Sequence, residues 1–306
     1  MKFLASCGVL LLTLTLCLSV PASAVTVRSI AVGDFPIAVA INPTTNRIYA
    51  ANYGSASDSV SVIDGNTNTV IATVPVGSGP FALDVNPSTN MVYVANNLDT
   101  TVSVIDGETN TVVATIEGFA SPEAVAVNQQ TNQIFVVNYL SAQVMEIDGA
   151  SNEIIATLQI AGQTSQGLAI NTAKNLVYVA SGSTIFVIDG NTDTINGSFI
   201  VPRSQGIGQW LAYDEVSNRL FAIGFAESGD VVYVLDATTG TVLGQITGDT
   251  DTPFQAPVCV TVFTPGVSVL ISDNSRNAVI PASETTFATL RTFHARNEPQ
   301  QIAVNH

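Results

Sequence analysis

Short runs of β-branched and other apolar residues recur along the chain from about residue 30, and turn residues separate them. In one stretch the runs cover 81–85, 91–96, 101–105 and 111–116. The segments between the runs are rich in Asn, Pro, Gly, Thr and Asp, which favour turns, and the runs lack the 3.6-residue period of an amphipathic helix. The pattern therefore predicts short β-strands joined by tight turns.

This four-run unit repeats with a period of about 43 residues. An Asn before the second run recurs at spacings of 44, 42, 43 and 43 residues, in the copies Asn46, Asn90, Asn132, Asn175 and Asn218. The run Val-Ile-Asp-Gly keeps the same period at 62–65, 104–107 and 187–190, with Glu-Ile-Asp-Gly at 146–149 and a weaker copy at 234–237. Four strands in about 43 residues is the period of WD40-like blades. We therefore predict an all-β fold, a β-propeller of four-stranded antiparallel blades.

The first 24 residues have a different pattern. Lys2 precedes an apolar run over 9–20, and Ala22-Ser23-Ala24 follows that run. A charged start, an apolar segment and an A-x-A site in this order are typical of a secretory signal peptide. We expect cleavage near Ala24 and a secreted or periplasmic protein without stable membrane insertion, because the run is shorter than the ~20 residues that span a bilayer. The predicted organisation is a signal peptide at 1–24 and a single β-propeller domain at 25–306.

The number of blades follows from length. Residues 25–306 hold about 6.6 repeats, and the two ends resemble parts of a repeat: 25–32 resembles the outermost strand and 299–304 the innermost. We therefore expect a seven-bladed type of propeller with an incomplete last blade, that is, six full blades plus two strands. The competing arrangement is a six-bladed ring with the surplus strands capping an edge.

Several of the repeated residues resemble a known family. The run Tyr-Val-Ala-Asn at 93–96, its variants at 49–52 and 135–138, the downstream Val-Ile-Asp-Gly and the Thr-Asn-Thr-Val-Val-Ala-Thr at 109–115 carry this resemblance. They look like the YVTN-repeat β-propeller family, which includes surface-layer-type and YncE-like secreted or periplasmic proteins. The resemblance is strong from 25 to about 250 and weak beyond. It implies a fold but no activity, because the shared residues are strand, turn and cap positions.

Composition narrows the function classes. The hydrophobic set makes up 46% of the chain, charged residues make up 11%, and the net charge is −15. Lys occurs only at Lys2 and Lys174, so we expect no nucleic-acid partner, because binding to phosphates needs clustered basic residues. Removal of residues 1–24 would leave Cys259 as the only cysteine, without an internal disulfide. Its apolar neighbours predict a buried thiol.

Few side chains could carry chemistry. His294 and His306 are the only histidines, so a His-based triad or a multi-His metal site cannot be assembled. The stretches 64–68 and 189–193 resemble the front of a calcium loop but lack its Glu at the twelfth position, and we interpret them as hairpin turns. We expect no catalytic residues, no metal and no cofactor.

A binding site is expected where the loops after the second strands and the loops between blades meet on one face. At these places five residues differ between copies: Tyr53, Glu123, Tyr139, Gln209 and Trp210. Trp210 is the only Trp of the chain, and the alternative for it is a place in the wall of the central channel. We favour a non-enzymatic binding or scaffold protein that presents this face to a protein or glycan partner at the cell envelope. The alternative is a propeller enzyme of lactonase-like or quinoprotein-like type, although the sequence offers no poised acid and base, no Trp-rich blades and no paired cysteines.

Overall fold

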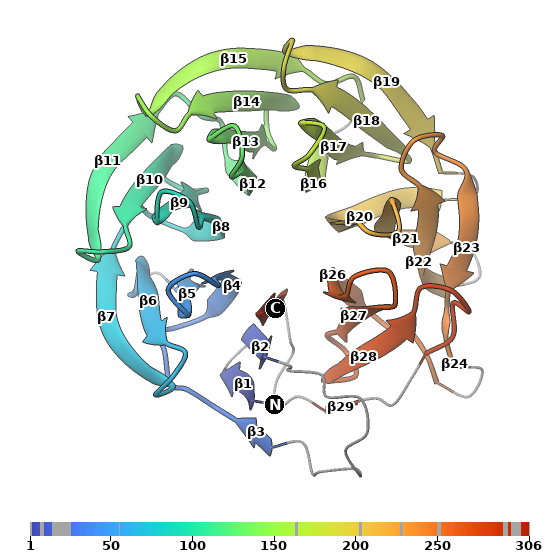
Figure 1. Ribbon diagram of the computed structural model, residues 1–306, viewed down its shortest axis with the longest axis horizontal. Coiled ribbons are helices and arrows are strands. Elements are labelled where there is room, and N and C mark those ends of the chain that lie inside the picture. The colour runs from blue at the N-terminus through green and yellow to red at the C-terminus, as the bar shows by residue number, and fades with distance from the viewer. Residues whose placement is uncertain are drawn as a thin grey trace.

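The molecule is a ring of sheets around a central axis (Figure 1). The computed structural model describes residues 2–6, 9–13, 26–54, 56–162, 165–201, 204–226, 229–249, 252–289, 293–294 and 301–305. Six of its sheets contain four antiparallel strands each, and in each of these the strands follow sequence order from the innermost to the outermost. The prediction of a β-propeller with four-stranded antiparallel blades is confirmed.

The strands of the second blade match the predicted runs to within one residue, and the first and third blades repeat the same order. The first blade consists of β4 (Pro36–Asn42), β5 (Arg47–Asn52), β6 (Ser59–Asp64) and β7 (Thr69–Pro75). The second consists of β8 (Pro80–Asn86), β9 (Met91–Asn96), β10 (Thr101–Asp106) and β11 (Thr111–Glu117). The third consists of β12 (Pro122–Asn128), β13 (Gln133–Asn138), β14 (Gln143–Asp148) and β15 (Glu153–Gln159).

The next three blades repeat the same order, with a longer inner strand in the fifth. The fourth blade consists of β16 (Ser165–Asn171), β17 (Leu176–Ser181), β18 (Thr184–Asp189) and β19 (Thr194–Ile200). The fifth consists of β20 (Ser204–Asp214), β21 (Arg219–Ala226), β22 (Gly229–Asp236) and β23 (Val242–Ile246). The sixth consists of β26 (Pro257–Thr264), β27 (Ser268–Asp273), β28 (Ala278–Ser283) and β29 (Phe293–His294). A small hairpin, β24 (Gly248–Asp249) with β25 (Thr252–Pro253), lies between the last two.

The prediction of a seven-bladed propeller with an incomplete last blade is wrong, because the structure has six blades of the repeated antiparallel type. A sheet of another construction lies between the sixth and the first blade, with the order β3 (Thr26–Arg28), β1 (Lys2–Ser6), β2 (Val9–Thr13) and β30 (Gln301–Asn305). Its pairs β1–β3 and β2–β30 are parallel. The two end strands therefore flank β1 and β2 instead of forming a blade with a gap. A count of repeats could not foresee this pairing, because it set residues 1–24 aside as a signal peptide.

Apolar side chains between neighbouring blades form the core. Between the first two blades, Tyr49 and Val60 pack with Leu83 and Val92, and similar clusters lie at the other blade interfaces. At the additional sheet, Ile302 of β30 packs against the sixth blade. Since each buried Val, Leu or Ile side chain contributes about 1.5–3 kcal/mol, these clusters stabilise the ring.

The Asn residues of the repeat form a second kind of link between blades. The amide nitrogen of Asn42 donates to Asn90 at 2.8 Å, that of Asn86 to Asn132 at 2.7 Å, and that of Asn128 to Asn175 at 2.6 Å. The acceptor residues also adopt positive φ, for example 59° at Asn90, which Asn tolerates better than most residues. The periodic Asn is therefore explained by two structural roles at once.

The Gly of the Asp-Gly turn serves close packing. In the second blade the positive φ of this turn belongs to Asn110, at 55°. A Cβ atom added to Gly107 would lie 2.6 Å from Asn90 Oδ1 and 2.6 Å from the Tyr49 hydroxyl. In the fifth blade Ala237 occupies the corresponding position, and its amide nitrogen lies 3.1 Å from the Asn218 carbonyl oxygen, against 2.9 Å for Gly107 and Asn90. The turn can therefore admit a methyl group only by opening slightly.

We expect Gly107→Ala to lower the free energy of unfolding by about 1–2 kcal/mol, because Asn90 and the buried Tyr49 hydroxyl must move away from the new methyl group. Urea unfolding followed by circular dichroism measures this change. The control is Glu108→Ala, which alters the exposed neighbour in the same turn and should change stability by less than about 0.5 kcal/mol. Equal stabilities for the two variants would contradict the close-packing explanation.

Candidate functional site

The ring has two different faces. One face, here called the turn face, carries the turns between first and second strands and between third and fourth strands. The other, here called the loop face, carries the loops after the second strands and the entries to the first strands. Backbone hydrogen bonds join these two kinds of loop, such as Tyr53 N to Phe35 O at 3.0 Å and Tyr139 N to Ser121 O at 3.0 Å. Loop-face residues from neighbouring segments are thus held in fixed positions.

Tyr53, one of the predicted binding residues, belongs to an aromatic cluster on the loop face. Its ring centroid lies 6.1 Å from that of Phe35 and 6.0 Å from that of Phe81, the second pair in an edge-to-face arrangement. Phe35 precedes β4 and Tyr53 follows β5, both in the first blade, and Phe81 is the second residue of β8 in the second blade. The cluster therefore bridges two blades, and 53% of the Phe35 surface remains exposed.

Other loops of this face also expose large apolar side chains. Leu98 is 62% exposed, Leu140 is 73% exposed and Phe225 is 45% exposed. They follow or end the second strands of the second, third and fifth blades. Asp34 and Asp99, both exposed, are the sequence neighbours of Phe35 and Leu98. The loop face thus combines apolar tips with acidic groups.

Glu123 and Tyr139 lie on the same face, both half-buried. Glu123 accepts a hydrogen bond from the amide nitrogen of Asn97 at 3.2 Å, and the same nitrogen donates to Ser121 at 2.7 Å. These contacts join the second blade to the third. The side chain of Gln209 lies outside the described residues.

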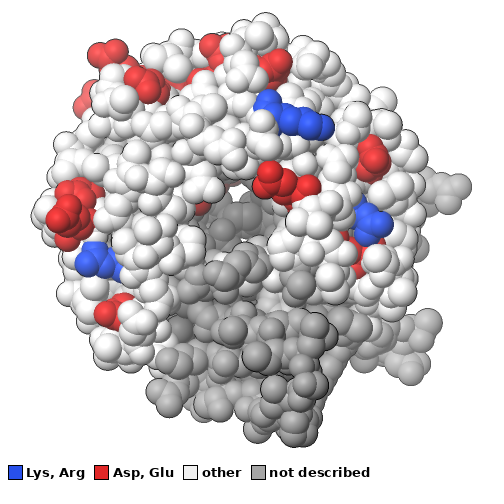
Figure 2. Space-filling model, viewed as in Figure 1, with Lys and Arg blue, Asp and Glu red and all other residues white. Residues whose placement is uncertain are grey.

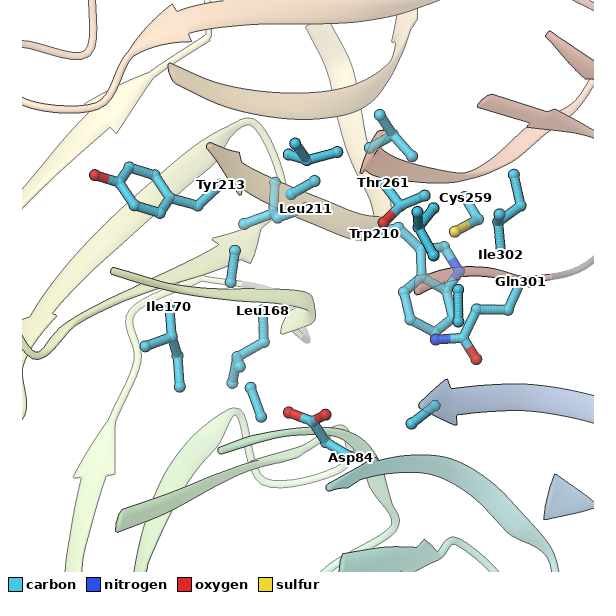
Figure 3. Close-up of a pocket in the computed structure, with 18 of the residues that line it drawn as sticks. Asp84, Leu168, Ile170, Trp210, Leu211, Tyr213, Cys259, Thr261, Gln301 and Ile302 are labelled. Atoms are coloured by element: carbon cyan, nitrogen blue, oxygen red, sulfur yellow. The ribbon is translucent and has the colours of Figure 1, made fainter. Parts of the chain in front are cut away.

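Trp210 lies in the wall of the central channel, which Tyr53, Glu123 and Tyr139 do not line (Figure 3). It is half-buried and packs against apolar clusters of the sixth blade, which include Cys259 and Val260. Its position agrees with the alternative that the sequence left open. Cys259 is buried, as its neighbours predict, and burial raises the pKa of its thiol to about 12.

The central channel encloses about 450 Å³ and is lined by the inner strands β4, β8, β12, β16, β20, β26 and β30. Among the described residues that line it, Asp84 carries the only carboxyl group. Asp84 accepts hydrogen bonds from the backbone N–H groups of Val85 and Val127, both at 2.8 Å. Desolvation raises the pKa of Asp84 to about 6, although the two backbone hydrogen bonds oppose the shift. Sequence analysis missed this residue, because it sits inside an otherwise apolar strand.

Glu146 and Glu284 also have raised pKa values, but both lie between blades and outside the channel wall. Burial raises the pKa of Glu146 to about 8, and the neighbouring Asp193 adds to the shift. Burial raises the pKa of Glu284 to about 7, and the neighbouring Asp214 adds to it. Since both Glu side chains are fully buried, we assign them to blade packing.

Within the described part of the chain, no three His, Cys, Asp or Glu side chains are grouped as metal ligands. Asp64 accepts hydrogen bonds from the backbone of Asn66 and Thr67, which makes this stretch an Asx turn. Among the described segments, none forms a helix that is long and apolar enough to cross a membrane.

Comparison with known proteins identifies the fold and nothing finer. No family model matches the chain, and no curated protein matches it either. Among solved structures, a chain of Kuenenia stuttgartiensis hydrazine synthase is similar with a TM-score of 0.80 at 12% sequence identity, over 94% of this chain and 93% of that chain. At such low identity this similarity supports the β-propeller fold alone. The YVTN-repeat family itself is not confirmed.

Proposed function

We propose that this protein is an exported, non-enzymatic binding protein whose loop face binds a protein partner at the cell envelope. The observation that carries the proposal is the set of exposed apolar tips on this face, Phe35, Leu98, Leu140 and Phe225. Apolar groups gathered on one face are typical of interaction sites. Fixed loops on a rigid scaffold are the usual place for such sites.

The chemistry of the loop face favours a protein over a glycan. Leu98 and Leu140 are aliphatic side chains, which contribute by burial against other apolar groups and cannot stack on a sugar ring as an aromatic residue does. Asp34 and Asp99 border the apolar tips. A fitting partner therefore has an apolar patch edged by Lys or Arg. Tyr53, Glu123 and Tyr139 fall within or beside this surface.

The test compares three forms of the full chain immobilised on beads and exposed to an envelope extract: wild type, a Leu98→Ser/Leu140→Ser variant, and a Val216→Ser/Val267→Ser variant. Val216 and Val267 are 72% and 57% exposed but lie in turns of the opposite face, so the third form is a matched control. We expect one protein species to be retained by wild type and control and at least about tenfold less by the loop-face variant.

Three results would overturn this proposal. Equal retention by all three forms would show that the loop face does not bind the protein. Elution of the bound species by soluble envelope glycan would assign the face to carbohydrate. Turnover of a lactone or an alcohol by wild type would favour the enzyme alternative.

A further inference from the structure

The central channel has the size and the wall of a small-molecule site. Its volume of about 450 Å³ falls in the range of ligand pockets, roughly 300–1,000 Å³. Most of its lining side chains are Val, Ile, Leu and Ala, and a few polar groups interrupt them. This composition suits a compact ligand with an apolar body and one polar group.

Asp84 differs from the residues at the same position in the other inner strands. Five of the other inner strands have alanine at the corresponding position and one has Thr261, the alanines being Ala40, Ala126, Ala169, Ala212 and Ala303. Blade packing at this position is therefore satisfied by a methyl group. In Figure 3 the carboxylate of Asp84 points into the channel.

The channel wall provides no internal partner for this charge. Its described lining residues include no Lys, Arg or His. The two backbone N–H groups that bind Asp84 hold the carboxylate in place, but a carboxylate has about four acceptor sites, so acceptor capacity remains. On the turn face, Figure 2 shows acidic side chains at the edge of the central opening and basic ones farther out. The surroundings therefore favour a cation.

Trp210 supplies the second recognition element. It extends into the same channel from β20, which lies across the axis from β8, the strand of Asp84 (Figures 1 and 3). An indole ring attracts cations through its π face, and it also packs well against apolar groups. A carboxylate on one wall and an indole on the other match a ligand with a positive charge inside an apolar shell.

We propose that the central channel binds a small organic ammonium ion, with the charge held by Asp84 and the alkyl groups against Trp210 and the apolar wall. This site is separate from the loop face, so the proposal is independent of the protein-binding function. Choline is a suitable probe, because 3,3-dimethylbutan-1-ol has the same shape without the charge. As the only Trp of the chain, Trp210 reports binding through its fluorescence.

The experiment titrates wild type at pH 7.5 with choline and with the neutral alcohol, up to about 20 mM, a range that detects millimolar binding. We expect choline to bind at least about tenfold more tightly than the alcohol, because only the cation interacts with the carboxylate. Asp84→Ala should bind choline at least about tenfold more weakly. This variant carries the residue that five other inner strands have, so it is expected to fold.

Lowering the pH tests the same charge without a mutation. Other titratable groups near Asp84 or in the channel wall are Tyr93, Tyr213 and Cys259, and burial raises the pKa of each. Asp84 is therefore the group that titrates near pH 6, and at pH 5 only about a tenth of it is ionised. We expect choline affinity to fall about tenfold from pH 7.5 to 5.

Equal affinities for choline and the alcohol would overturn the proposal. Unchanged choline binding in Asp84→Ala would also overturn it, and so would the absence of any fluorescence change at the highest choline concentration. In these cases the role of Asp84 would be limited to its hydrogen bond with the backbone of Val127.

Discussion

Replacing Glu146 with valine is expected to raise the free energy of unfolding at pH 8 by roughly 1–3 kcal/mol. Glu146 is fully buried, and its Oε2 atom has no hydrogen-bond partner. Four other blades have valine at this place in the third strand, at Val62, Val104, Val187 and Val234, and all four are buried. The interface therefore accepts this side chain. Gln133, which donates to Oε1 of Glu146 at 2.5 Å, keeps the Gly190 carbonyl oxygen as an acceptor at 2.8 Å.

The stability that Glu146→Val gains over wild type depends on pH, because burial raises the pKa of Glu146 to about 8 from the usual 4.5. Between these values the native protein holds a proton that the unfolded chain has released. The stabilisation linked to this proton is complete below about pH 4.5 and is lost as the pH rises toward 8. Above that pH, Glu146 carries a buried negative charge beside Asp193. The variant lacks this titration, so the difference between the two proteins should be small at pH 5 and largest at pH 8.

Urea unfolding of both proteins at several pH values between 5 and 8.5 measures the effect. Glu153→Gln is the control, since it removes one negative charge from an exposed position in β15 and should change stability by less than about 0.5 kcal/mol at every pH. A difference between Glu146→Val and wild type that does not change with pH would show that Glu146 is not protonated in the native state.

The repeat itself could be predicted from sequence, because the same physical demands recur in every blade. The four strands of the second blade begin and end within one residue of the apolar runs at 81–85, 91–96, 101–105 and 111–116. Turn residues bound these runs on both sides, so strand ends were well defined. The number of blades could not be predicted in this way. β2 and β30 are far apart in the sequence and form a parallel pair, and such a pair leaves no periodic pattern in the sequence.

Some residues of the candidate sites could also be predicted from sequence and others could not. Tyr53, Glu123 and Tyr139 were predicted as binding residues because loop positions that vary among otherwise similar copies stand out. Asp84 and Glu146 were not predicted, although each replaces an apolar residue of the repeat, because each sits inside an otherwise apolar strand. A comparison of strand positions across the copies would have found both. Asp84 lines the channel, whereas Glu146 is buried between blades. This difference depends on tertiary packing, which the spacing of residues in the sequence does not show.

Trp210→Ala is expected to lower the free energy of unfolding by about 2–3 kcal/mol, which is less than the 3–5 kcal/mol typical of a fully buried Trp. The indole is half-buried, and it packs against two apolar clusters of the sixth blade. Removing it leaves a gap between β20 and β26 that the fixed strands cannot close. Trp210→Phe should recover much of the loss, because a phenyl ring fills part of the same space.

The same variant distinguishes the channel wall from the loop face. Phe225→Ala, at an exposed tip of the same blade, should change stability by less than about 1 kcal/mol but weaken retention of the protein partner. Trp210→Ala should lower stability but leave retention of the protein partner unchanged, when retention is measured at a temperature where the variant stays folded. The sequence-based hypothesis that Trp210 contacts the partner requires the opposite pattern: a lost interaction in a protein whose urea midpoint is unchanged. Since Trp210 packs against the apolar clusters that contain Cys259 and Val260, we expect the midpoint to move and the partner to remain bound.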